Sequence, residues 1–336
     1  MTLHSHSRVT HVALARALAM IVAAIALFPV ASLRAQMGER AVKFILPVAT
    51  ASGVDTITRA ASPALSKALG HPVIVDNQPG AGGIVGTSAL VKAVPDGYTL
   101  SIVSNNHVIY PSVYKSVPFD PIADITPIAV IGSTPIVIVV NSKVPAKNAQ
   151  ELIALLKANP GKYNYGSAGT GSTMYLIAEL FKAQANVDLV HVAYKGGAPA
   201  LSDVMGGQIP MTFLSTVASL SMVKAGRVRA LGISGRSRSP VAPEIPTIAE
   251  SGVPGFEFYL WQAMIVPAGI PKPIMTRLNG DVITALNHPS SKELLVNLGA
   301  EPTPSTPQEA DAHIHTEVER WKRTLRAAPP QSATGR

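Results

Sequence analysis

Cysteine is absent from all 336 residues of the chain. This absence excludes a disulfide-stabilised scaffold, a thiolate zinc site, an iron–sulfur cluster and a cysteine nucleophile. Charged residues are also scarce, at 14% against about 25% in an ordinary soluble domain, and aromatic residues reach only 5%. Because apolar residues make up 47%, the chain is neither disordered nor a solvated coiled coil. Its length predicts two domains that bury their cores without covalent cross-links.

Long hydrophobic runs are missing except near the N-terminus. Residues 17–30 form an unbroken apolar run of 14 residues, which follows Arg8 and Arg16 and is followed by Leu-Arg-Ala at 33–35. This layout is typical of a secretory signal peptide, because a bilayer-spanning helix needs about 20 apolar residues. We therefore predict that residues 1–35 are removed and that the mature chain is periplasmic. An uncleaved amphipathic anchor is the alternative.

The net charge of +8 raises the question of nucleic-acid binding. The leader holds three of the basic residues, Arg8, Arg16 and Arg34, and no acidic residue. The other positive charges are scattered, with close groupings only at 236–238 and 320–323. Neither grouping is interleaved with stacking aromatic residues, so we expect a solvated surface and no nucleic-acid partner.

Short apolar runs alternate with helical patterns in the first part of the mature chain. Turn residues separate these segments, and Gly70 ends the first helical pattern. The pattern predicts strands at 42–47, 73–75 and 98–103 and helices at 55–69 and 87–93. Strands that alternate with helices are typical of a mostly parallel sheet with both faces covered.

A second alternating series follows, and the C-terminus is helical. The expected elements of this series are helices 149–158, 173–185 and 199–205, a strand ending at Tyr165, and strands 189–192, 211–214 and 230–233. Helices are then expected at 274–286, 291–298 and 307–326. The fold class predicted from this order is α/β, with each domain a mixed, mostly parallel sheet flanked by helices.

Two segments are expected to cross between the two series. They are the β-branched run 136–140 and the segment 256–266. We predict a discontinuous first domain of residues 36–138 plus 262–336 and a second domain of residues 139–261. Since ligands of open α/β sheets bind beyond the carboxyl ends of strands, the ligand cleft is expected between these domains.

The strongest local signal is the loop Gly-Ser-Ala-Gly-Thr-Gly-Ser-Thr at 166–173, between a strand and a helix. Its amide hydrogens and hydroxyls can converge on one oxyanion at a helix N-terminus. The spacing of Gly166 and Gly171 resembles a phosphate loop, but Ser172 stands where such a loop has lysine. The loop therefore predicts a carboxylate cradle without a fixed charge, and a glycine-rich turn with a capping serine is the alternative.

The loop at 47–55 has the same position before its helix. Thr50, Ser52 and the amides through Val54 could hold a second oxyanion by hydrogen bonds and the helix dipole. Asp55 has three interpretations: it orients the loop, it meets a cationic part of a ligand, or it only occupies the first helical turn.

Other glycine and histidine patterns favour neither a nucleotide site nor an active site. The cluster at 80–86 departs from the dinucleotide fingerprint and is interpreted as a structural turn. His313 and His315 are two residues apart on a predicted helix and do not form a zinc pair. A hydrolase using Ser172 would need a base that the sequence does not identify. We expect no catalytic residue, no metal and no cofactor.

Several motifs together resemble the Bug family, the substrate-binding proteins of tripartite tricarboxylate transporters. The resemblance covers essentially the whole mature chain. It rests on Pro47 with Gly53 and Asp55, NQPGAGGIVGT (77–87), VPDGYTL (94–100), ELIALLKANPGKYNYGSAGTGS (151–172), HVAYKGGAPALSDVMGGQI (191–209), RALGISG, PEIPTIAESGVPGFE, PAGIP and Trp321.

This resemblance implies a type II periplasmic binding-protein fold, in which two α/β domains close like a clamshell on a small carboxylate. It also implies that backbone amides, hydroxyls and waters from the two loops hold the ligand. The first loop departs from the family, because residues 48–52 are Val-Ala-Thr-Ala-Ser instead of an aromatic and a small residue followed by Pro-Gly-Gly. A histidine that family members commonly have three residues after the serine of the second loop is Tyr175 here. These departures predict a larger and less polar acid than a citrate-like ligand.

The function predicted from the sequence is periplasmic capture of a di- or tricarboxylate, or of an aromatic acid, for the permease subunits of a tripartite transporter. The alternatives are a receptor that presents its ligand to a membrane sensor and a periplasmic enzyme. We expect a monomer. The predicted ligand-binding residues are Val48, Thr50, Ala51, Ser52, Gly53, Val54, Asp55, Gly166, Ser167, Gly169, Thr170, Gly171, Ser172 and Tyr175.

Overall fold

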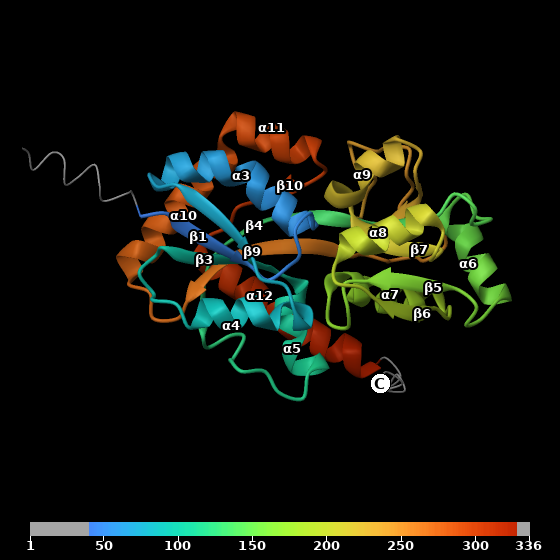
Figure 1. The fold of residues 1–336 in the computed structure, drawn as a ribbon, viewed down its shortest axis with the longest axis horizontal. Coiled ribbons are helices and arrows are strands. Elements are labelled where there is room, and N and C mark those ends of the chain that lie inside the picture. Colours follow the sequence, from blue (N-terminus) through green and yellow to red (C-terminus); the bar gives the residue numbers. More distant parts are fainter. Residues whose placement is uncertain (1–39, 328–336) are drawn as a thin grey trace, which may run out of the picture. The chain divides into compact units, whose positions relative to one another are not determined.

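The computed structural model describes residues 40–327, and the predicted signal peptide lies outside them. The strands of this part of the chain form a mixed sheet in the order β2-β1-β3-β9-β4-β7-β5-β6, with β8 and β10 also paired to β4 (Figure 1). The strands are β1 Val42–Leu46, β2 Val73–Asn77, β3 Thr99–Ser104, β4 Ile125–Val140, β5 Asn164–Ser167, β6 Val190–Ala193, β7 Met211–Ser215, β8 Arg229–Ile233, β9 Tyr259–Pro267 and β10 Glu301–Pro302.

The sheet consists of two strand groups that share β4. In the first group β1 is parallel to β2 and β3, and in the second β5 is parallel to β6 and β7. The first part of β4, from Ile125 to Pro135, is antiparallel to β9. From Ile136 onward β4 is instead antiparallel to β7 and β8. The predicted α/β class with mixed sheets is thus confirmed. Parallel pairs do not predominate, because β4 and β9 are antiparallel to every strand with which they pair.

Helices cover both faces of the strand groups. Figure 1 shows α3 and α11 on one side of the first group and α4, α5 and α12 on the other. No helix in residues 40–327 combines the length and apolarity that crossing a membrane requires. The helices are α3 Gly53–Leu69, α4 Ile84–Val91, α5 Asn105–Val113, α6 Ala149–Ala158, α7 Thr173–Ala185, α8 Gly197–Gly206, α9 Thr216–Lys224, α10 Lys272–Asn287, α11 Pro289–Asn297 and α12 Pro307–Ala327, with a 3-10 turn η1 at Ala81–Gly83.

Alternation along β4 divides the hydrophobic core between the two faces of the sheet. Ile138 and Val140 belong to the larger cluster of buried apolar residues, whereas Val137 and Val139 belong to a smaller one. Successive side chains of a strand point to opposite faces. A strand that is buried on both faces therefore needs the continuous β-branched sequence found here.

The structure contains elements that the sequence patterns did not predict. These are α5, α9, β10 and the first part of β4. Pro111 lies inside α5, and Pro127 and Pro135 lie inside β4. The pairing of β4 with β9 shifts register directly after Pro127, and such an irregularity accommodates a residue that cannot donate to the ladder. Because proline is disfavoured inside helices and strands, the sequence patterns did not predict α5 or the first part of β4.

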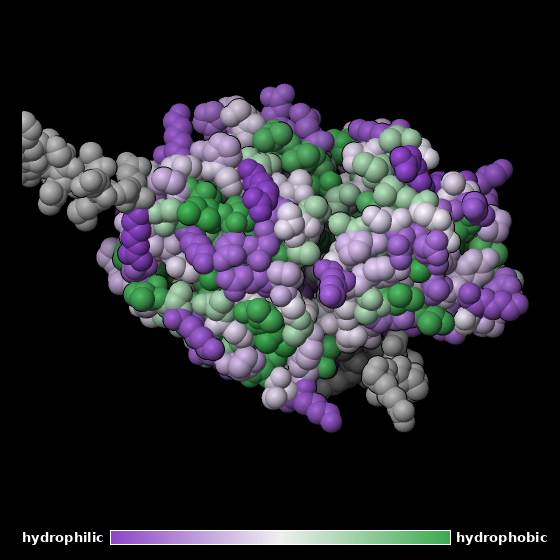
Figure 2. All heavy atoms as spheres, in the orientation of Figure 1, coloured by the Kyte–Doolittle hydropathy of each residue, from purple (hydrophilic) through white to green (hydrophobic). Residues whose placement is uncertain are grey.

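Large exposed apolar residues are dispersed over the surface. They are Ile74, Val85, Val94, Val190 and Leu294. Figure 2 shows small apolar patches separated by hydrophilic residues on the face that it displays. Apolar residues scattered singly over a water-exposed surface are normal and need no functional explanation.

Candidate ligand-binding site

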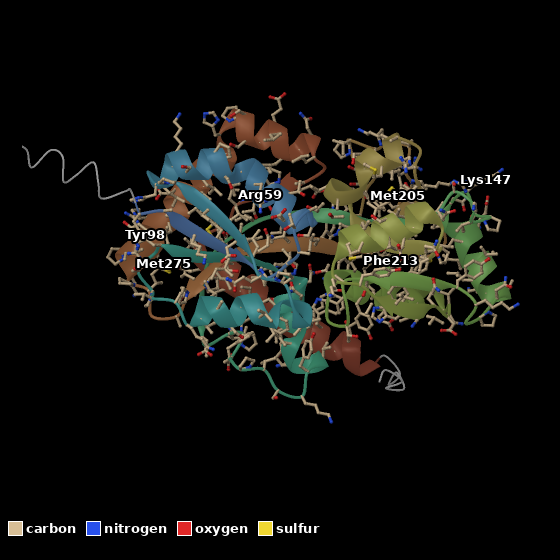
Figure 3. All side chains as sticks on the ribbon, in the orientation of Figure 1. Arg59, Tyr98, Lys147, Met205, Phe213 and Met275 are labelled. Atoms are coloured by element: carbon tan, nitrogen blue, oxygen red, sulfur yellow. The ribbon has the colours of Figure 1, made fainter. Side chains whose placement is uncertain are left out.

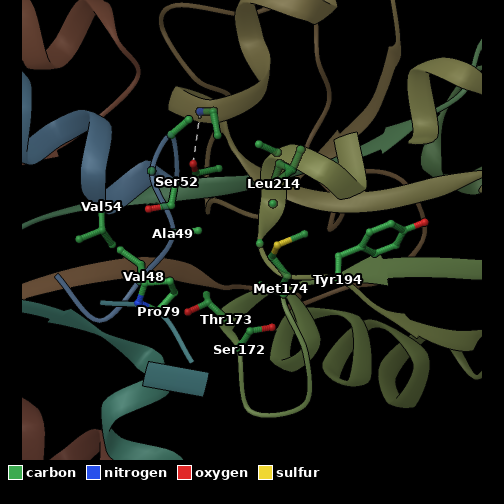
Figure 4. A pocket seen from close by; sticks show the side chains of 18 of the residues that line it. Val48, Ala49, Ser52, Val54, Pro79, Ser172, Thr173, Met174, Tyr194 and Leu214 are labelled. Atoms are coloured by element: carbon green, nitrogen blue, oxygen red, sulfur yellow. Dashed lines mark hydrogen bonds between the residues drawn. The ribbon is translucent and has the colours of Figure 1, made fainter. Parts of the chain in front are cut away.

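A cavity of about 710 Å³ lies where strands of both groups end (Figure 4). Pro47 follows β1, Ala168 follows β5, and Ser104 and Ser215 are the last residues of β3 and β7; all four line the cavity. The carboxyl ends of parallel strands meet at one edge of a sheet, and this edge is where α/β proteins bind ligands. The size falls within the range of small-molecule sites, roughly 300 to 1,000 Å³.

Six helices begin at the cavity. The N-cap residues of α3, α4, α5, α7, α8 and α9 all line it; they are Ser52, Gly83, Ser104, Ser172, Gly196 and Ser215. Each helix N-terminus carries a partial positive charge and first-turn amides that have no intrahelical acceptor. The convergence of these ends creates a cavity suited to an anion.

The side-chain charge around the cavity is positive, as is the partial charge of the helix N-termini. Among the described residues that line it there is no aspartate and no glutamate, and Lys195 is the charged one. Lys195 is exposed, so water shares its charge. The positive potential therefore comes mainly from backbone dipoles, as the sequence analysis expected for the two loops, with one lysine that it did not anticipate.

The first predicted loop places part of its residues in the cavity wall. Val48, Ala51, Ser52, Gly53 and Val54 line the cavity, whereas Thr50 and Asp55 do not. The Ser52 hydroxyl accepts the amide hydrogen of Asp55 at 3.2 Å and so caps α3. This cap holds the other first-turn amides of α3 toward the cavity.

Asp55 orients the first loop. One carboxylate oxygen accepts the amide hydrogen of Ala51 at 2.9 Å, which fixes Ala51 in a left-handed conformation with φ of 62°. The other oxygen accepts from Arg59 at 2.9 Å and from Asn77 at 3.0 Å. Asp55 is only 2% exposed and does not line the cavity. Of its three interpretations, the geometry supports loop orientation.

The second predicted loop contributes Ser172 to the cavity. The Ser172 hydroxyl caps α7 by accepting the amide hydrogen of Tyr175 at 3.3 Å. Gly169 and Gly171 have φ of 97° and 84°, so the loop adopts turns that favour glycine. Outside the cavity lining are Gly166, Ser167, Gly169, Thr170, Gly171 and Tyr175.

Ser167 and His191 form a hydrogen-bonded pair behind this loop. The Ser167 Oγ lies 2.6 Å from the His191 Nε2 and accepts the amide hydrogen of Gly169 at 3.0 Å. Tyr175 packs on the His191 ring at a centroid distance of 5.0 Å, and burial raises the pKa of Tyr175 to about 12. Burial also lowers the pKa of His191. Because Ser167 is fully buried, this pair fixes the loop and has no access to a substrate.

The glycine-rich turn at 80–86 is part of the cavity wall, which the sequence analysis did not anticipate. Gly80 to Gly83 line the cavity. The Asn106 side chain donates to the Gly82 carbonyl at 2.7 Å. Gly83 has φ of 110°, and a Cβ there would lie 2.5 Å from the Asn106 Nδ2 and the Tyr110 hydroxyl. Only glycine lets this turn approach the buried side chains of α5.

Sequence reasoning missed the wall that the second strand group supplies. The wall comes from the segment after β6, from α8, from the end of β7 and from α9. The missed residues of this wall are Tyr194, Lys195, Gly196, Gly197, Ala198, Leu201, Ser202, Met205, Leu214, Ser215, Ala218, Ser221 and Met222. Their position after strand ends was the available signal, since loops at that position line sites in α/β folds.

Two contacts join the segment at 104–114 to the loop at 166–173. The Tyr114 hydroxyl donates to the Thr170 carbonyl at 3.0 Å, and the Ser104 and Thr173 hydroxyls lie 3.5 Å apart. A Cβ on Gly82 or Gly171 would also meet the Tyr114 hydroxyl. Tyr114 therefore joins the glycine turn at 80–83 to the loop at 166–173.

Replacing Tyr114 with phenylalanine is expected to weaken ligand binding about fivefold, because a hydrogen bond worth about 1 kcal/mol to the loop at 166–173 is lost. Isothermal titration calorimetry with a bound carboxylate measures the change. Tyr98→Phe is the matched control, since Tyr98 does not line the cavity and lies far from the lining residue Met205 in Figure 3. Equal affinities for Y114F and the unchanged protein would show that this bond does not contribute to ligand binding.

Comparison with known proteins agrees with this architecture. The family model of the tripartite tricarboxylate transporter family receptor matches residues 57–328. The chain belongs to this family. Protein BugT of Bordetella pertussis is 33% identical over 289 residues, which cover 85% of this chain and 89% of BugT.

Solved structures of similar proteins include two ligand complexes. The structure of Rpa4515 of R. palustris with adipate is 33% identical and superposes with a TM-score of 0.83, over 86% of this chain and 97% of that one. MatC (Rpa3494) of Rhodopseudomonas palustris with bound malate is 29% identical with a TM-score of 0.80, over 85% and 99%. The predicted membership of the Bug and tripartite tricarboxylate family and the predicted type II periplasmic binding-protein fold are thereby confirmed.

Proposed function

We propose that this family receptor captures a small organic carboxylate in the periplasm and delivers it to the permease subunits of a tripartite transporter. The observation that carries the proposal is the convergence of six helix N-caps on a cavity whose described lining has no carboxylate. Adipate in Rpa4515 and malate in MatC support the same ligand chemistry. Export by cleavage of residues 1–35 and action as a monomer are parts of the proposal.

The proposed carboxylate sites are the N-termini of α3 and α7. The hydroxyls of Ser52 and Ser172 each accept one amide hydrogen of their own helix, which leaves each hydroxyl proton to donate to a ligand oxygen. Gly53 and Thr173 are the first residues of the same two helices, and their amides belong to the proposed sites. Hydrogen bonds from neutral donors to a carboxylate contribute about 1.5 to 3 kcal/mol each when the site excludes water.

The cavity is proposed to open and close between two domains, residues 36–138 plus 262–336 and residues 139–261. The support is the change of partners along β4, which pairs with β9 up to Pro135 and with β7 and β8 from Ile136. Two crossing strands can absorb a hinge rotation while each strand group stays rigid. Closure would expel water and strengthen the hydrogen bonds to the ligand.

Ligand binding is expected to raise the melting temperature by about 5 °C when the carboxylate is present at 100 times its Kd, because only the native state binds it. Differential scanning fluorimetry against mono-, di- and tricarboxylates measures the shift. The neutral amides of the same acids, with every carboxylate converted, are the matched controls, since they keep the shape and lose the charge. A folded protein whose melting temperature responds to no carboxylate would overturn the proposal.

A periplasmic enzyme receives no support from the cavity. The Ser167–His191 pair is the serine and histidine arrangement that the sequence did not identify, yet Ser167 is fully buried and does not line the cavity. A nucleophile has to reach its substrate. The family and its solved members are binding proteins, which favours binding without chemistry.

A further inference from the structure

We propose that the ligand is a monocarboxylic acid with a hydrocarbon body, and that this body lies in an apolar compartment formed by the second strand group. The inference rests on the proposed carboxylate binding and adds the class of acid. The compartment is defined by Met174, Leu201, Met205, Leu214 and Met222, all of which line the cavity. None of these residues was among the binding residues predicted from the sequence.

The compartment is an open face of the smaller hydrophobic cluster. Leu214 is a buried member of that cluster, at 4% exposure. Met174, Leu201, Met205 and Met222 pack against the cluster but are only partly buried. The partly buried residues that pack against this cluster also line the cavity, so this side of the cavity wall is apolar. Filling it with hydrocarbon would complete the burial of these side chains.

Helical spacing directs these residues to the cavity. On α8 the lining residues Ala198, Leu201, Ser202 and Met205 follow the spacing of one helix face. Ala218, Ser221 and Met222 do so on α9. The two helices thus present mostly apolar stripes to the cavity. Figure 4 shows Met174 and Leu214 close together at this wall, across from Ser52.

Gly197 gives the compartment its depth. A Cβ at this position would lie 3.0 Å from the Leu214 Cδ2 and 3.5 Å from the Met174 sulfur. The absent side chain leaves the surface of Leu214 and Met174 accessible to a ligand. Methionine is flexible and polarisable, so a wall with three methionines adapts to hydrocarbon bodies of different shapes.

The polar side chains near the compartment do not form a second carboxylate site. The hydroxyl of Tyr194 donates to Asp203 at 2.7 Å and points away from the cavity in Figure 4. Lys195, Ser202 and Ser221 are exposed, so water competes for them. Ser215, the N-cap of α9, lies beside Gly53 at the carboxylate end of the cavity. Met205 and Met222 lie about two helical turns from the first-turn amides of α8 and α9. A second carboxylate placed against these two methionines would therefore lose its hydration without gaining partners. The compartment therefore selects against a charge at the far end of the ligand.

Matched pairs of acids test the class directly. Octanoate and suberate have the same chain length, and suberate replaces the terminal methyl group by a carboxylate. Calorimetry on the purified protein is expected to show at least tenfold tighter binding of octanoate. Octanoate is also expected to bind about tenfold tighter than hexanoate, because two more methylene groups are buried.

Tighter binding of suberate, adipate or malate would overturn the inference and leave the proposed function intact. Binding of no acid would overturn both.

A methionine variant tests whether the affinity for octanoate depends on the apolar compartment. Met205→Gln keeps the length of the side chain and adds a polar end, and it is expected to weaken octanoate about tenfold. Met275→Gln is the control, because Met275 is also partly buried but packs against the larger cluster and lies far from Met205 in Figure 3. Equal affinity for octanoate in M205Q and M275Q, with both variants folded by circular dichroism, would contradict the location of the hydrocarbon body.

Discussion

Replacing Ser172 with aspartate is expected to reduce carboxylate affinity about a thousandfold while the protein stays as stable as before. Aspartate and serine are equally good N-cap residues, so the variant still caps α7. The new charge, however, lies at the cavity wall, where Ser172 is 8% exposed. It cancels part of the positive potential of this helix end and repels the ligand.

The size of the effect follows from Coulomb's law. Two like charges about 4 Å apart repel by about 4 kcal/mol at an effective dielectric constant of about 20. Since about 1.4 kcal/mol corresponds to a factor of ten, the affinity falls by about three powers of ten. Loss of the hydrogen bond from the serine hydroxyl to the charged ligand oxygen costs by itself about 1.5 kcal/mol, less than half of the charge repulsion.

Ser172→Asn is the matched control for charge. Asparagine also caps a helix and has nearly the shape of aspartate. We expect S172N to bind within about tenfold of the unchanged protein, since it loses at most one good hydrogen bond. Calorimetry gives the affinities, and urea denaturation checks that the stabilities agree. Similar affinities for S172D and S172N would show that the α7 N-terminus does not meet the carboxylate.

The second large effect concerns stability in acid. His107 lies in α5 and is fully buried, and its Nε2 lies 2.7 Å from the Pro121 carbonyl, to which the neutral ring donates. The Nδ1 atom is buried without a hydrogen-bond partner in the described chain. Burial lowers the pKa of His107 from 6.5 to about 4. We therefore expect the free energy of unfolding to fall by about 3 kcal/mol as the pH drops from 7 to 4.

The sign follows from proton uptake. In the unfolded chain the imidazole binds a proton near pH 6.5, whereas in the folded protein it does so only near pH 4. Between these values unfolding takes up a proton, so acid favours the unfolded state. The stabilisation is complete above pH 6.5 and is lost as the pH falls through that window.

Urea denaturation of the unchanged protein and of His107→Gln at pH 7, 6, 5 and 4.5 isolates this contribution. Glutamine can donate to the Pro121 carbonyl but does not titrate, so the H107Q profile is expected to be flatter. Subtracting one profile from the other removes the pH dependence that comes from carboxylates, because these titrate in both proteins. His288→Gln, at an exposed position, is the control and should keep the steep profile. Parallel profiles for H107Q and the unchanged protein would contradict the assignment.

Local sequence patterns predicted most elements because each depends on few neighbours. The bounds of α6 and α7 agree with the predicted 149–158 and 173–185. Both helices have a good N-cap, Asn148 and Ser172, and both combine it with helical apolar spacing. By contrast, α9 begins with a β-branched pair and contains two serines, so its pattern was too weak to predict a helix.

In the two candidate loops the sequence predicted some, but not all, of the residues that line the cavity. Ser52 and Ser172 are N-caps that line the cavity, and both follow from a strand, a polar turn and a helix in the sequence. Thr50 and Ser167 have equally suitable hydroxyls, yet Thr50 does not line the cavity and Ser167 is bonded to His191. Which side of a loop faces a cavity depends on residues distant in sequence, here Asp55 with Asn77 and Tyr175 with His191.

The sequence by itself determined the absence of thiol chemistry, the α/β class, the family and the two loops that open α3 and α7, because each depends on composition or on short-range order. Only the tertiary structure decided that four more helices begin at the same cavity and that the wall opposite Ser52 is apolar. The physical reason is the shared sheet. Strand ends that are far apart in the sequence meet at one edge of it, and this edge determines which backbone dipoles and which partly buried methionines face a common space.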